Sequence, residues 1–212
     1  MPRPETDIEA GREKLIQTAE VIIRERGAIN FTITDLAAEA GMSQSNVYRF
    51  FENKDELAEA MAGRWFAELI TIIEDLVEAN MPARQKLFEF FARRLQIKRA
   101  RFEEDPDLFR SYMELGDQHF EVIRGYVDLT DHYMAIILAE AMEEGYFEGL
   151  ELDQIVSLVN TMVQPFCNPN LMMDMMHLAD EDRLHQVIDT ILMGLKARSK
   201  DASKKAKLHI AS

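Results

Sequence analysis

Hydrophobic side chains recur along most of the chain with the spacing of an α-helix. In residues 9–26, Leu15, Ala19 and Ile22 fall on one face of a helix with 3.6 residues per turn. The same period returns in five later segments: 54–80, 82–104, 107–145 with a break near Gly116, 153–163 and 180–198. No alternating strand pattern and no internal repeat emerges. The pattern therefore predicts an all-α fold of about nine helices.

Residues 32–54, TITDLAAEAGMSQSNVYRFFENK, depart from this pattern of long helices. Thr32 and Asp35 have the spacing of a capping box, in which two side chains satisfy free N–H groups at a helix start. Gly41 supplies the left-handed residue that a tight turn needs. A short helix that ends in such a turn is the first half of a helix-turn-helix motif.

The second half of the motif follows directly. Ser43 can cap a helix from Gln44 to about Phe51, on which Val47 points inward. Asn53 then caps the next, long helix. The N-terminal helices are therefore predicted to form a three-helix domain with a helix-turn-helix motif.

These residues resemble the DNA-binding signature of the TetR family of transcriptional regulators. The match includes the helix REKLIQTAEVIIRERG at 12–27, the turn AGMS at 40–43, the YRFF run at 48–51 and the Asn53-Lys54 pair. It covers roughly the first 60 residues, and the remaining chain resembles the family only in length and helical pattern. The resemblance implies a homodimer that binds a palindromic operator as double-stranded DNA and responds to a small-molecule effector.

The resemblance and the outward position of the side chains predict the DNA contacts. Gln44, Ser45 and Arg49 are expected to read base edges, and Tyr48 and Lys54 to contact phosphates. The predicted set comprises Thr32, Thr34, Ser43, Gln44, Ser45, Asn46, Tyr48, Arg49 and Lys54.

The charge distribution is unusual for a DNA-binding protein. The net charge is −14; residues 1–57 carry 7 basic and 11 acidic groups, residues 58–195 carry 11 and 26, and residues 196–212 carry 6 and 1. DNA binding is then expected to depend on a local face and to be salt-sensitive. The alternative is a helical small-molecule-binding or protein-interaction module without sequence-specific DNA binding.

Composition indicates a globular protein with three parts. The 212 residues are 47% hydrophobic, and no run of about 18 apolar residues is present. With a polar start and a single cysteine, Cys167, the chain is expected to be cytoplasmic and without a membrane segment. The expected domains are 1–53 for the helix-turn-helix, 54–198 for effector binding and dimerisation, and 199–212 as a disordered basic tail.

An effector pocket is expected among the aromatic and apolar side chains of the second domain. The candidates are Phe66, Phe88, Phe91, Phe102, Phe109, Tyr112, Met113, His119, Phe120, Tyr133 and Met162. Because this region is acidic and Arg94, Arg99 and Arg124 are expected on exposed faces, a neutral or cationic lipophilic effector is favoured over an anion. Its binding is expected to tilt the 54–80 helix and to release the operator, as in a repressor.

The apolar stripes of two C-terminal helices are expected to form the dimer interface. The candidates are Ile155, Leu158, Val159, Met162, Leu184, Val187, Ile188, Ile191 and Leu195.

Catalytic and metal chemistry is not indicated. The chain has no Gly-rich phosphate loop, no GxSxG and no HExxH sequence, and Cys167 lacks a neighbouring histidine. Acidic residues with occasional histidines lack the spacing of known metal sites, and the Met-rich segment 172–176 is interpreted as a short connector. No catalytic residue, metal ligand or cofactor is predicted, and the chain is not expected to be an enzyme.

Overall fold

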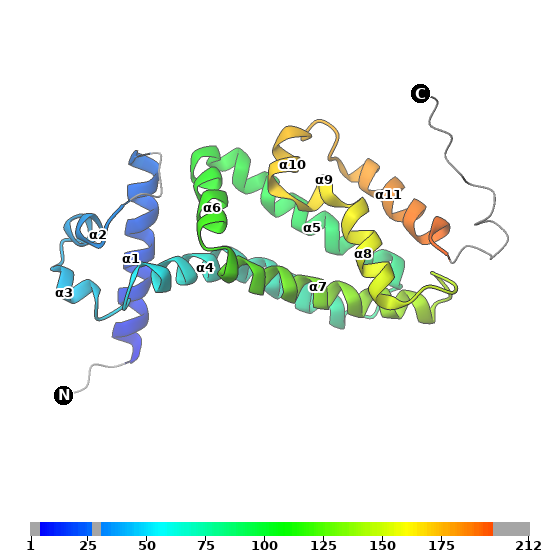
Figure 1. Ribbon diagram of the computed structural model, residues 1–212, viewed down its shortest axis with the longest axis horizontal. Helices are drawn as coiled ribbons and strands as arrows, with labels where there is room; N and C mark the ends of the chain where they lie inside the picture. The colour runs from blue at the N-terminus through cyan, green and yellow to red at the C-terminus, as the bar shows by residue number, and fades with distance from the viewer. Residues whose placement is uncertain (1–4, 27–30, 197–212) are drawn as a thin grey trace, which may run out of the picture. The chain divides into compact units, whose positions relative to one another are not determined.

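The computed structural model of the protein describes residues 5–26 and 31–196, and these residues form helices and no strand. The helices are α1 (Glu5–Arg26), α2 (Ile33–Ala40), α3 (Gln44–Val47), α4 (Lys54–Glu78), α5 (Ala83–Glu104), α6 (Pro106–Gln118), α7 (Phe120–Glu143), α8 (Leu152–Met162), α9 (Gln164–Cys167), α10 (Pro169–Asp174) and α11 (Glu181–Gly194) (Figure 1). The predicted all-α class is confirmed. The predicted tail 199–212 lies outside the described residues.

The helices are grouped into two compact units. The first unit contains residues 1–72 and 96–130, and the second contains residues 73–95 and 131–212. The helix-turn-helix segments therefore share a unit with α6 and with parts of α4, α5 and α7. The predicted domain boundary after residue 53 does not coincide with this division and stays a prediction.

The first unit is built around α1. Its inward face carries Leu15, Ala19, Ile22 and Ile23, each no more than 1% exposed. Helix α1 contacts both α2 and α6, and Leu36 of α2 belongs to the same buried cluster as the α1 residues. The apolar stripe predicted on α1 thus packs against α2, which in turn contacts α3, and Val47 of α3 belongs to the same buried cluster.

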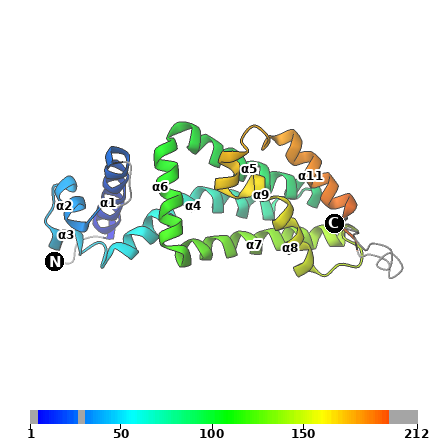
Figure 2. The ribbon, with the colours of Figure 1, turned by 45° about the horizontal axis from the view of Figure 1, so that its top comes forward.

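The second unit contains the C-terminal helices. The views in Figures 1 and 2 show α9 and α10 as short helices between α8 and α11 in the chain, and α9 contacts both α8 and α10. The Met-rich segment predicted as a connector thus includes part of α10, whose first turn is capped by the Asn168 side chain. These two short helices explain why the described chain has eleven helices rather than about nine.

Two predicted helix boundaries are wrong. Helix α3 has four residues and ends at Val47, whereas the expected helix ran to about Phe51. Helices α6 and α7 are separated at His119, with φ −120° and ψ 49°, rather than at Gly116. Gly116 lies inside α6, because a single glycine weakens a helix only modestly when neighbouring turns continue it.

Candidate nucleic-acid interface and pocket

The capping box at the start of α2 forms as predicted. The Thr32 hydroxyl accepts a hydrogen bond from the Asp35 N–H at 3.1 Å, and the Thr32 N–H donates to the Asp35 carboxylate at 2.8 Å. The Thr32 hydroxyl also donates to Asp35 at 2.6 Å, and Arg26 lies 3.0 Å from the same carboxylate. The hydrogen bonds from Thr32 and then Arg26 lower the pKa of Asp35 from 3.8 to about 2.

The turn between α2 and α3 is also confirmed. Gly41 adopts φ 65° and ψ 36°, which glycine reaches without steric penalty. The Met42 N–H then donates to the Ala37 carbonyl at 2.8 Å. Ser43 caps α3 by accepting a hydrogen bond from the Asn46 N–H at 3.3 Å.

The chain after α3 continues as tight turns. The Phe50 and Phe51 N–H groups both donate to the Val47 carbonyl, at 2.9 and 3.1 Å. Phe51 is fully buried, whereas Phe50 lies at partial depth beneath Gly11 of α1. A Cβ at Gly11 would lie 2.2 Å from the Phe50 ring, so glycine is required for this approach.

Most side chains predicted to contact DNA are solvent-exposed. The exposed ones are Thr32, Thr34, Ser43, Gln44, Ser45, Tyr48 and Arg49, and the half-buried ones are Asn46 and Lys54. Gln44 donates to the Thr34 hydroxyl at 2.7 Å, which links α2 to α3. Lys54 lies over the Phe31 ring at 5.2 Å. Arg49 forms no ion pair with any described residue, so its guanidinium is available to a phosphate or a base edge.

Arg12 of α1 anchors the end of the motif, a role that sequence reasoning did not identify. It donates to the Phe50 carbonyl and to Glu56 of α4 at 2.6 Å, and its guanidinium lies 4.3 Å from the Phe51 ring centroid. Glu56 also accepts the Glu52 N–H at 2.6 Å; this bond and then the Arg12 bond lower the pKa of Glu56. One arginine thus connects α1, the segment after α3 and α4.

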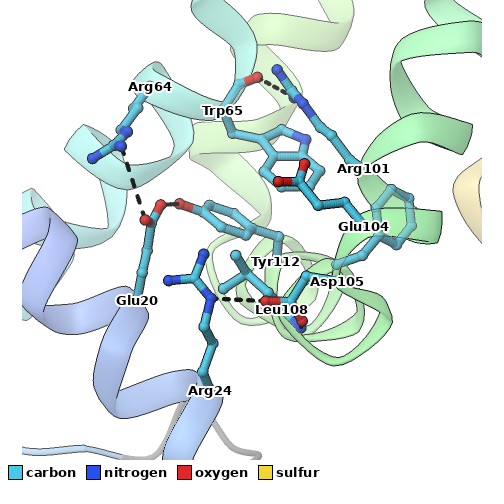
Figure 3. A pocket seen from close by; sticks show the side chains of 10 residues that line it. Glu20, Arg24, Arg64, Trp65, Arg101, Glu104, Asp105, Leu108 and Tyr112 are labelled. Atoms are coloured by element: carbon cyan, nitrogen blue, oxygen red, sulfur yellow. Dashed lines mark hydrogen bonds and ion pairs between the residues drawn. The ribbon is translucent and has the colours of Figure 1, made fainter.

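A pocket of about 460 Å³ lies within the first unit. Its lining comes from α1, α4, α5 and α6 and consists of Glu20, Arg24, Arg64, Trp65, Arg101, Glu104, Asp105, Leu108, Phe109 and Tyr112 (Figure 3). The Trp65 ring stacks on Tyr112, with centroids 4.2 Å apart, and meets Phe109 edge-on at 5.6 Å. The pocket therefore combines an aromatic cluster with charged side chains.

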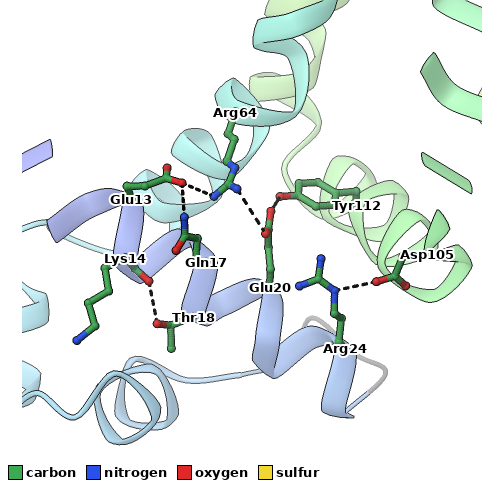
Figure 4. A network of polar contacts seen from close by, with 9 residues as sticks. All are labelled: Glu13, Lys14, Gln17, Thr18, Glu20, Arg24, Arg64, Asp105 and Tyr112. Carbon is green, nitrogen blue, oxygen red and sulfur yellow. Dashed lines mark hydrogen bonds and ion pairs between the residues drawn. The ribbon is translucent and has the colours of Figure 1, made fainter. Parts of the chain in front are cut away.

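Polar contacts join α1 to α4 and α6 at this pocket (Figure 4). The Tyr112 hydroxyl of α6 donates to Glu20 of α1 at 2.6 Å, and Arg64 of α4 pairs with Glu13 of α1 at 2.8 Å. Arg24 of α1 pairs with Asp105, the residue that caps α6, at 2.8 Å. Burial first, and then the neighbouring Glu20 carboxylate, raise the pKa of Tyr112.

The predicted pocket residues of the first unit are only partly brought together. Phe109 and Tyr112 line the pocket, and Phe102 meets Phe109 edge-on at 5.5 Å. Phe66 instead stacks on Tyr126 at 4.6 Å.

Three further candidates of this unit do not line the pocket. Met113 packs against the buried cluster around α1, and the His119 ring nitrogen lies 3.3 Å from Asp55. Phe120 is 61% exposed, so its predicted place in an enclosed pocket is wrong.

The candidates of the second unit occupy several environments. Phe88 stacks on His185 at 3.4 Å, and Phe91 is fully buried. Tyr133 donates a hydrogen bond near the surface, while Met162 is 38% exposed on α8 and borders an open groove of about 800 Å³. These side chains do not converge on one described cavity.

Sequence reasoning missed most of the charged lining of the pocket. No local sequence pattern pairs Glu20 with a tyrosine 92 positions later. The available signal was that Trp65 is the only tryptophan in the chain.

The predicted dimer face requires a correction. Five of its residues are no more than 1% exposed within a single chain and so face the core of their own protomer: Ile155, Val159, Leu184, Ile188 and Ile191. A side chain already enclosed in this way gains no further burial from a partner. The accessible candidates are Leu158 at 41% and Met162 at 38%, with Val187 and Leu195 partly exposed.

Within residues 5–26 and 31–196, no three His, Cys, Asp or Glu side chains gather in a group that fits a metal ion. None of the helices in this part of the chain combines the length and the hydrophobicity of a membrane span.

The geometry around α2 and α3 is that of a helix-turn-helix regulator. A family model described as "Bacterial regulatory proteins, tetR family" matches residues 15–61, and one described as "Tetracyclin repressor-like, C-terminal domain" matches residues 83–188. The chain belongs to the TetR family of bacterial transcriptional regulators.

Relatives in sequence are distant. The "Fatty acid metabolism regulator protein" of Bacillus subtilis is 22% identical over 144 residues, which are 66% of this chain and 72% of the relative. An uncharacterised HTH-type transcriptional regulator in the dhlA 5′ region of Xanthobacter autotrophicus is 26% identical over 163 residues, which are 74% of this chain and 78% of the relative.

Solved structures share the fold. SmeT, the repressor of a Stenotrophomonas maltophilia multidrug efflux pump, gives a TM-score of 0.66 at 22% identity, covering 88% of this chain and 91% of SmeT. FadR of Bacillus subtilis, solved in complex with stearoyl-CoA, gives a TM-score of 0.59 at 19% identity, covering 86% of this chain and 98% of FadR.

Proposed function

We propose that the protein is a homodimeric repressor that acts in the cytoplasm, binds a palindromic operator through α3 and its flanking residues, and releases the operator when a small lipophilic effector binds. No catalytic role is proposed. The observation that carries the proposal is a fully capped helix-turn-helix whose Gln44, Ser45, Tyr48 and Arg49 are solvent-exposed.

The small size of α3 makes dimerisation part of this proposal. A helix of four residues presents few side chains to base edges, so each half-site contributes modest affinity. Two copies on half-sites about 34 Å apart would combine their contacts. The acidic character of residues 1–57 makes this combination more important, since few phosphates are neutralised per copy.

The DNA-binding surface is tested by two substitutions. Arg49→Ala is expected to weaken operator binding about 10- to 100-fold per half-site and to reduce discrimination between sequences. Lys54→Ala is expected to weaken binding to all sequences and to reduce the salt dependence by about one counterion per half-site. Fluorescence anisotropy with DNA from upstream of the coding region measures both.

Arg93→Ala is the matched control, because Arg93 is exposed on α5 and pairs with Glu89 four residues earlier. Its operator affinity should equal that of the unmodified protein. Full affinity in both test variants would reject the assignment of these residues. Absence of any sequence preference in the unmodified protein would favour the helical binding module instead.

Dimerisation is proposed to use the accessible residues of α8 rather than the buried stripe. Leu158 and Met162 are one helical turn apart, and both are exposed in the protomer. Leu158→Glu is expected to produce a folded monomer, because a charge placed in an apolar interface is costly to bury. Ile188→Glu should instead unfold the protomer, since Ile188 is 1% exposed within it.

Sedimentation and circular dichroism separate the two cases. A Leu158→Glu protein that remains dimeric would place the interface elsewhere. A monomeric unmodified protein at micromolar concentration would reject the two-half-site scheme.

The effector is proposed to be lipophilic and neutral or cationic, as the acidic charge of residues 58–195 favours. The competing class is an acyl anion. It is supported by the likeness to Bacillus subtilis FadR, whose solved complex contains stearoyl-CoA. Arg94 of α5 also supports an acyl anion, because its Nε is buried and has no hydrogen-bond partner among the described residues. The prediction that Arg94 lies on an exposed face is corrected accordingly.

Three probes with one C12 tail distinguish these classes: dodecylamine, dodecanol and dodecanoate, used below their micelle concentrations. Release of operator DNA and a raised melting temperature with the amine or alcohol alone would support the proposed class. Release with dodecanoate alone, lost in Arg94→Gln and retained in Arg93→Gln, would establish the acyl anion.

A further inference from the structure

The pocket of the first unit has an unusual balance of aromatic and charged groups. Its buried wall is formed by Phe109 and Tyr112, at 1% and 5% exposure, with the partly buried Trp65 stacked against Tyr112. The guanidinium of Arg101 lies over the Trp65 ring, 4.5 Å from its centroid. This indole therefore already accepts a cation on its π face.

Each arginine of the pocket has a carboxylate partner. Arg24 pairs with Asp105 at 2.8 Å. Arg64 and Arg101 pair at 2.8 Å with Glu13 and Glu68, neither of which lines the pocket. The positive charge of the lining is thus compensated, in part by carboxylates outside it.

Two carboxylates of the pocket remain without a close cation. The Glu20 side chain is 12% exposed and accepts the Tyr112 hydroxyl, but its ion pair with Arg64 is long at 4.0 Å. Glu104 is exposed and forms no ion pair with any described residue. Figure 3 shows these two side chains reaching the pocket from α1 and α5. The pocket and its immediate partners therefore have an excess of negative charge.

We propose that this pocket binds a small organic cation, with its charge at Glu20 and its apolar body against the Trp65, Phe109 and Tyr112 rings. The volume of about 460 Å³ lies in the range of small-molecule sites. A carboxylate that is largely removed from water attracts a cation more strongly than one at the surface.

Occupancy of this site would act on α1 directly. A cation at Glu20 competes with Arg64 of α4 and changes the environment of the Tyr112 hydroxyl of α6, so it alters the contacts that hold α1. This consequence for operator affinity rests on the proposed function, whereas binding itself does not.

The protein carries its own probe for binding, because Trp65 is the only tryptophan. We would titrate the full chain with benzyltrimethylammonium, benzyl alcohol and phenylmethanesulfonate and follow tryptophan fluorescence without DNA. The cation is expected to give a saturable change, the alcohol a weaker one and the sulfonate none. Equal responses to all three, no saturable change, or tightest binding of the sulfonate would overturn the proposal.

Glu20→Gln keeps the side-chain shape and an acceptor for Tyr112 but removes the charge, and should weaken cation binding roughly tenfold. Glu74→Gln is the matched control, since Glu74 accepts the Tyr133 hydroxyl at 2.7 Å in the second unit; its cation affinity should be unchanged. Glu104→Gln, at an exposed position, gives a second variant if Glu20→Gln fails to fold, and should weaken binding about threefold. Unaltered affinity in the folded Glu20 variant, or in Glu104→Gln if that one is used, would reject the site.

A second measurement separates this inference from the proposed function. Operator affinity is measured with and without saturating benzyltrimethylammonium. A saturable Trp65 response without a change in operator affinity would reject the link to α1 and retain the site. If the protein binds no operator but gives the Trp65 response, the proposed function is rejected and the cation site is retained.

Discussion

The exposed ion pairs around α1 in the first unit contrast with a buried polar contact inside the second unit. In the first, long-range contacts between helices include Arg12–Glu56, Arg24–Asp105 and Arg64–Glu13, whose side chains are 28–48% exposed. In the second, the ammonium of Lys86 is almost completely buried, and it bonds to the Val77 carbonyl at 2.7 Å and to Glu140 at 2.9 Å.

This difference has an energetic consequence. An exposed ion pair contributes only about 0–1 kcal/mol, so each of these three ion pairs of α1 can be exchanged at little cost. A buried ammonium that loses its partners costs several times more. The three exposed ion pairs of α1 are therefore easier to exchange than the buried contacts of Lys86.

The largest effect is expected for the aromatic core of the second unit. Phe91 of α5 is fully buried and meets Phe90 edge-on at 5.1 Å. Phe91→Ala should lower the free energy of unfolding by about 3–5 kcal/mol, through lost burial and the cavity left behind. Urea unfolding measures the change. The control is Phe120→Ala, at a side chain that is 61% exposed, which should change the free energy of unfolding by no more than about 0.5 kcal/mol. Equal losses of stability in the Phe91 and Phe120 variants would contradict the assigned burial.

Lys86 tests the buried polar contact itself. Lys86→Met keeps most of the side-chain volume but leaves the Val77 carbonyl and Glu140 without their donor. A loss of about 2 kcal/mol is expected, because the Glu140 carboxylate is partly exposed and recovers some hydration. The control is Arg84→Met, which breaks the exposed pair with Asp189 and should cost less than about 1 kcal/mol. Greater stability of Lys86→Met than of the unmodified protein would show that the buried pair is not stabilising.

Tyr112 and Tyr133 provide the same contact in the two units. Both hydroxyls donate to a glutamate, at 2.6 and 2.7 Å, but Tyr112 is 5% exposed whereas the Tyr133 bond lies at the surface. Tyr112→Phe should cost about 1–1.5 kcal/mol in thermal unfolding, since its loss leaves Glu20 largely buried without a donor. Tyr133→Phe should produce a smaller change. The reverse order would indicate that Glu20 is hydrated in the folded protein.

Local sequence signals predicted local structure well. The capping residues Thr32 and Asn53 and the turn at Gly41 depend on neighbours within three or four positions, and each was recognised and is confirmed. The short span of α3 was not predicted. Helical periodicity does not distinguish a helix from successive turns that also place Val47 and Phe51 inward.

Long-range contacts were harder to predict. Glu20 and Tyr112 are separated by 92 positions, and nothing in either segment identifies the other as its partner. The face of Ile188 was also ambiguous, since an apolar stripe shows that a side is buried but not whether the core or a second chain covers it. The structure assigns Ile188 to the core.

The smallest effect is expected from acid titration of the capping box in the first unit. Hydrogen bonds from Thr32 and then Arg26 lower the pKa of Asp35 from 3.8 to about 2, so the folded state holds its proton less tightly than the unfolded state. The stability that this carboxylate contributes is complete above pH 4 and is lost as the pH falls from about 4 to 2. Asp35→Asn should therefore reduce the fall in the urea midpoint within that window and leave the slope above pH 5 unchanged. Thr32→Val removes the largest cause of the lowered pKa and should act in the same window, with little further change in the double variant. Additive losses would mean that the two side chains act separately, and an unaltered acid slope in Asp35→Asn would mean that the carboxylate is not held in its charged form by the cap.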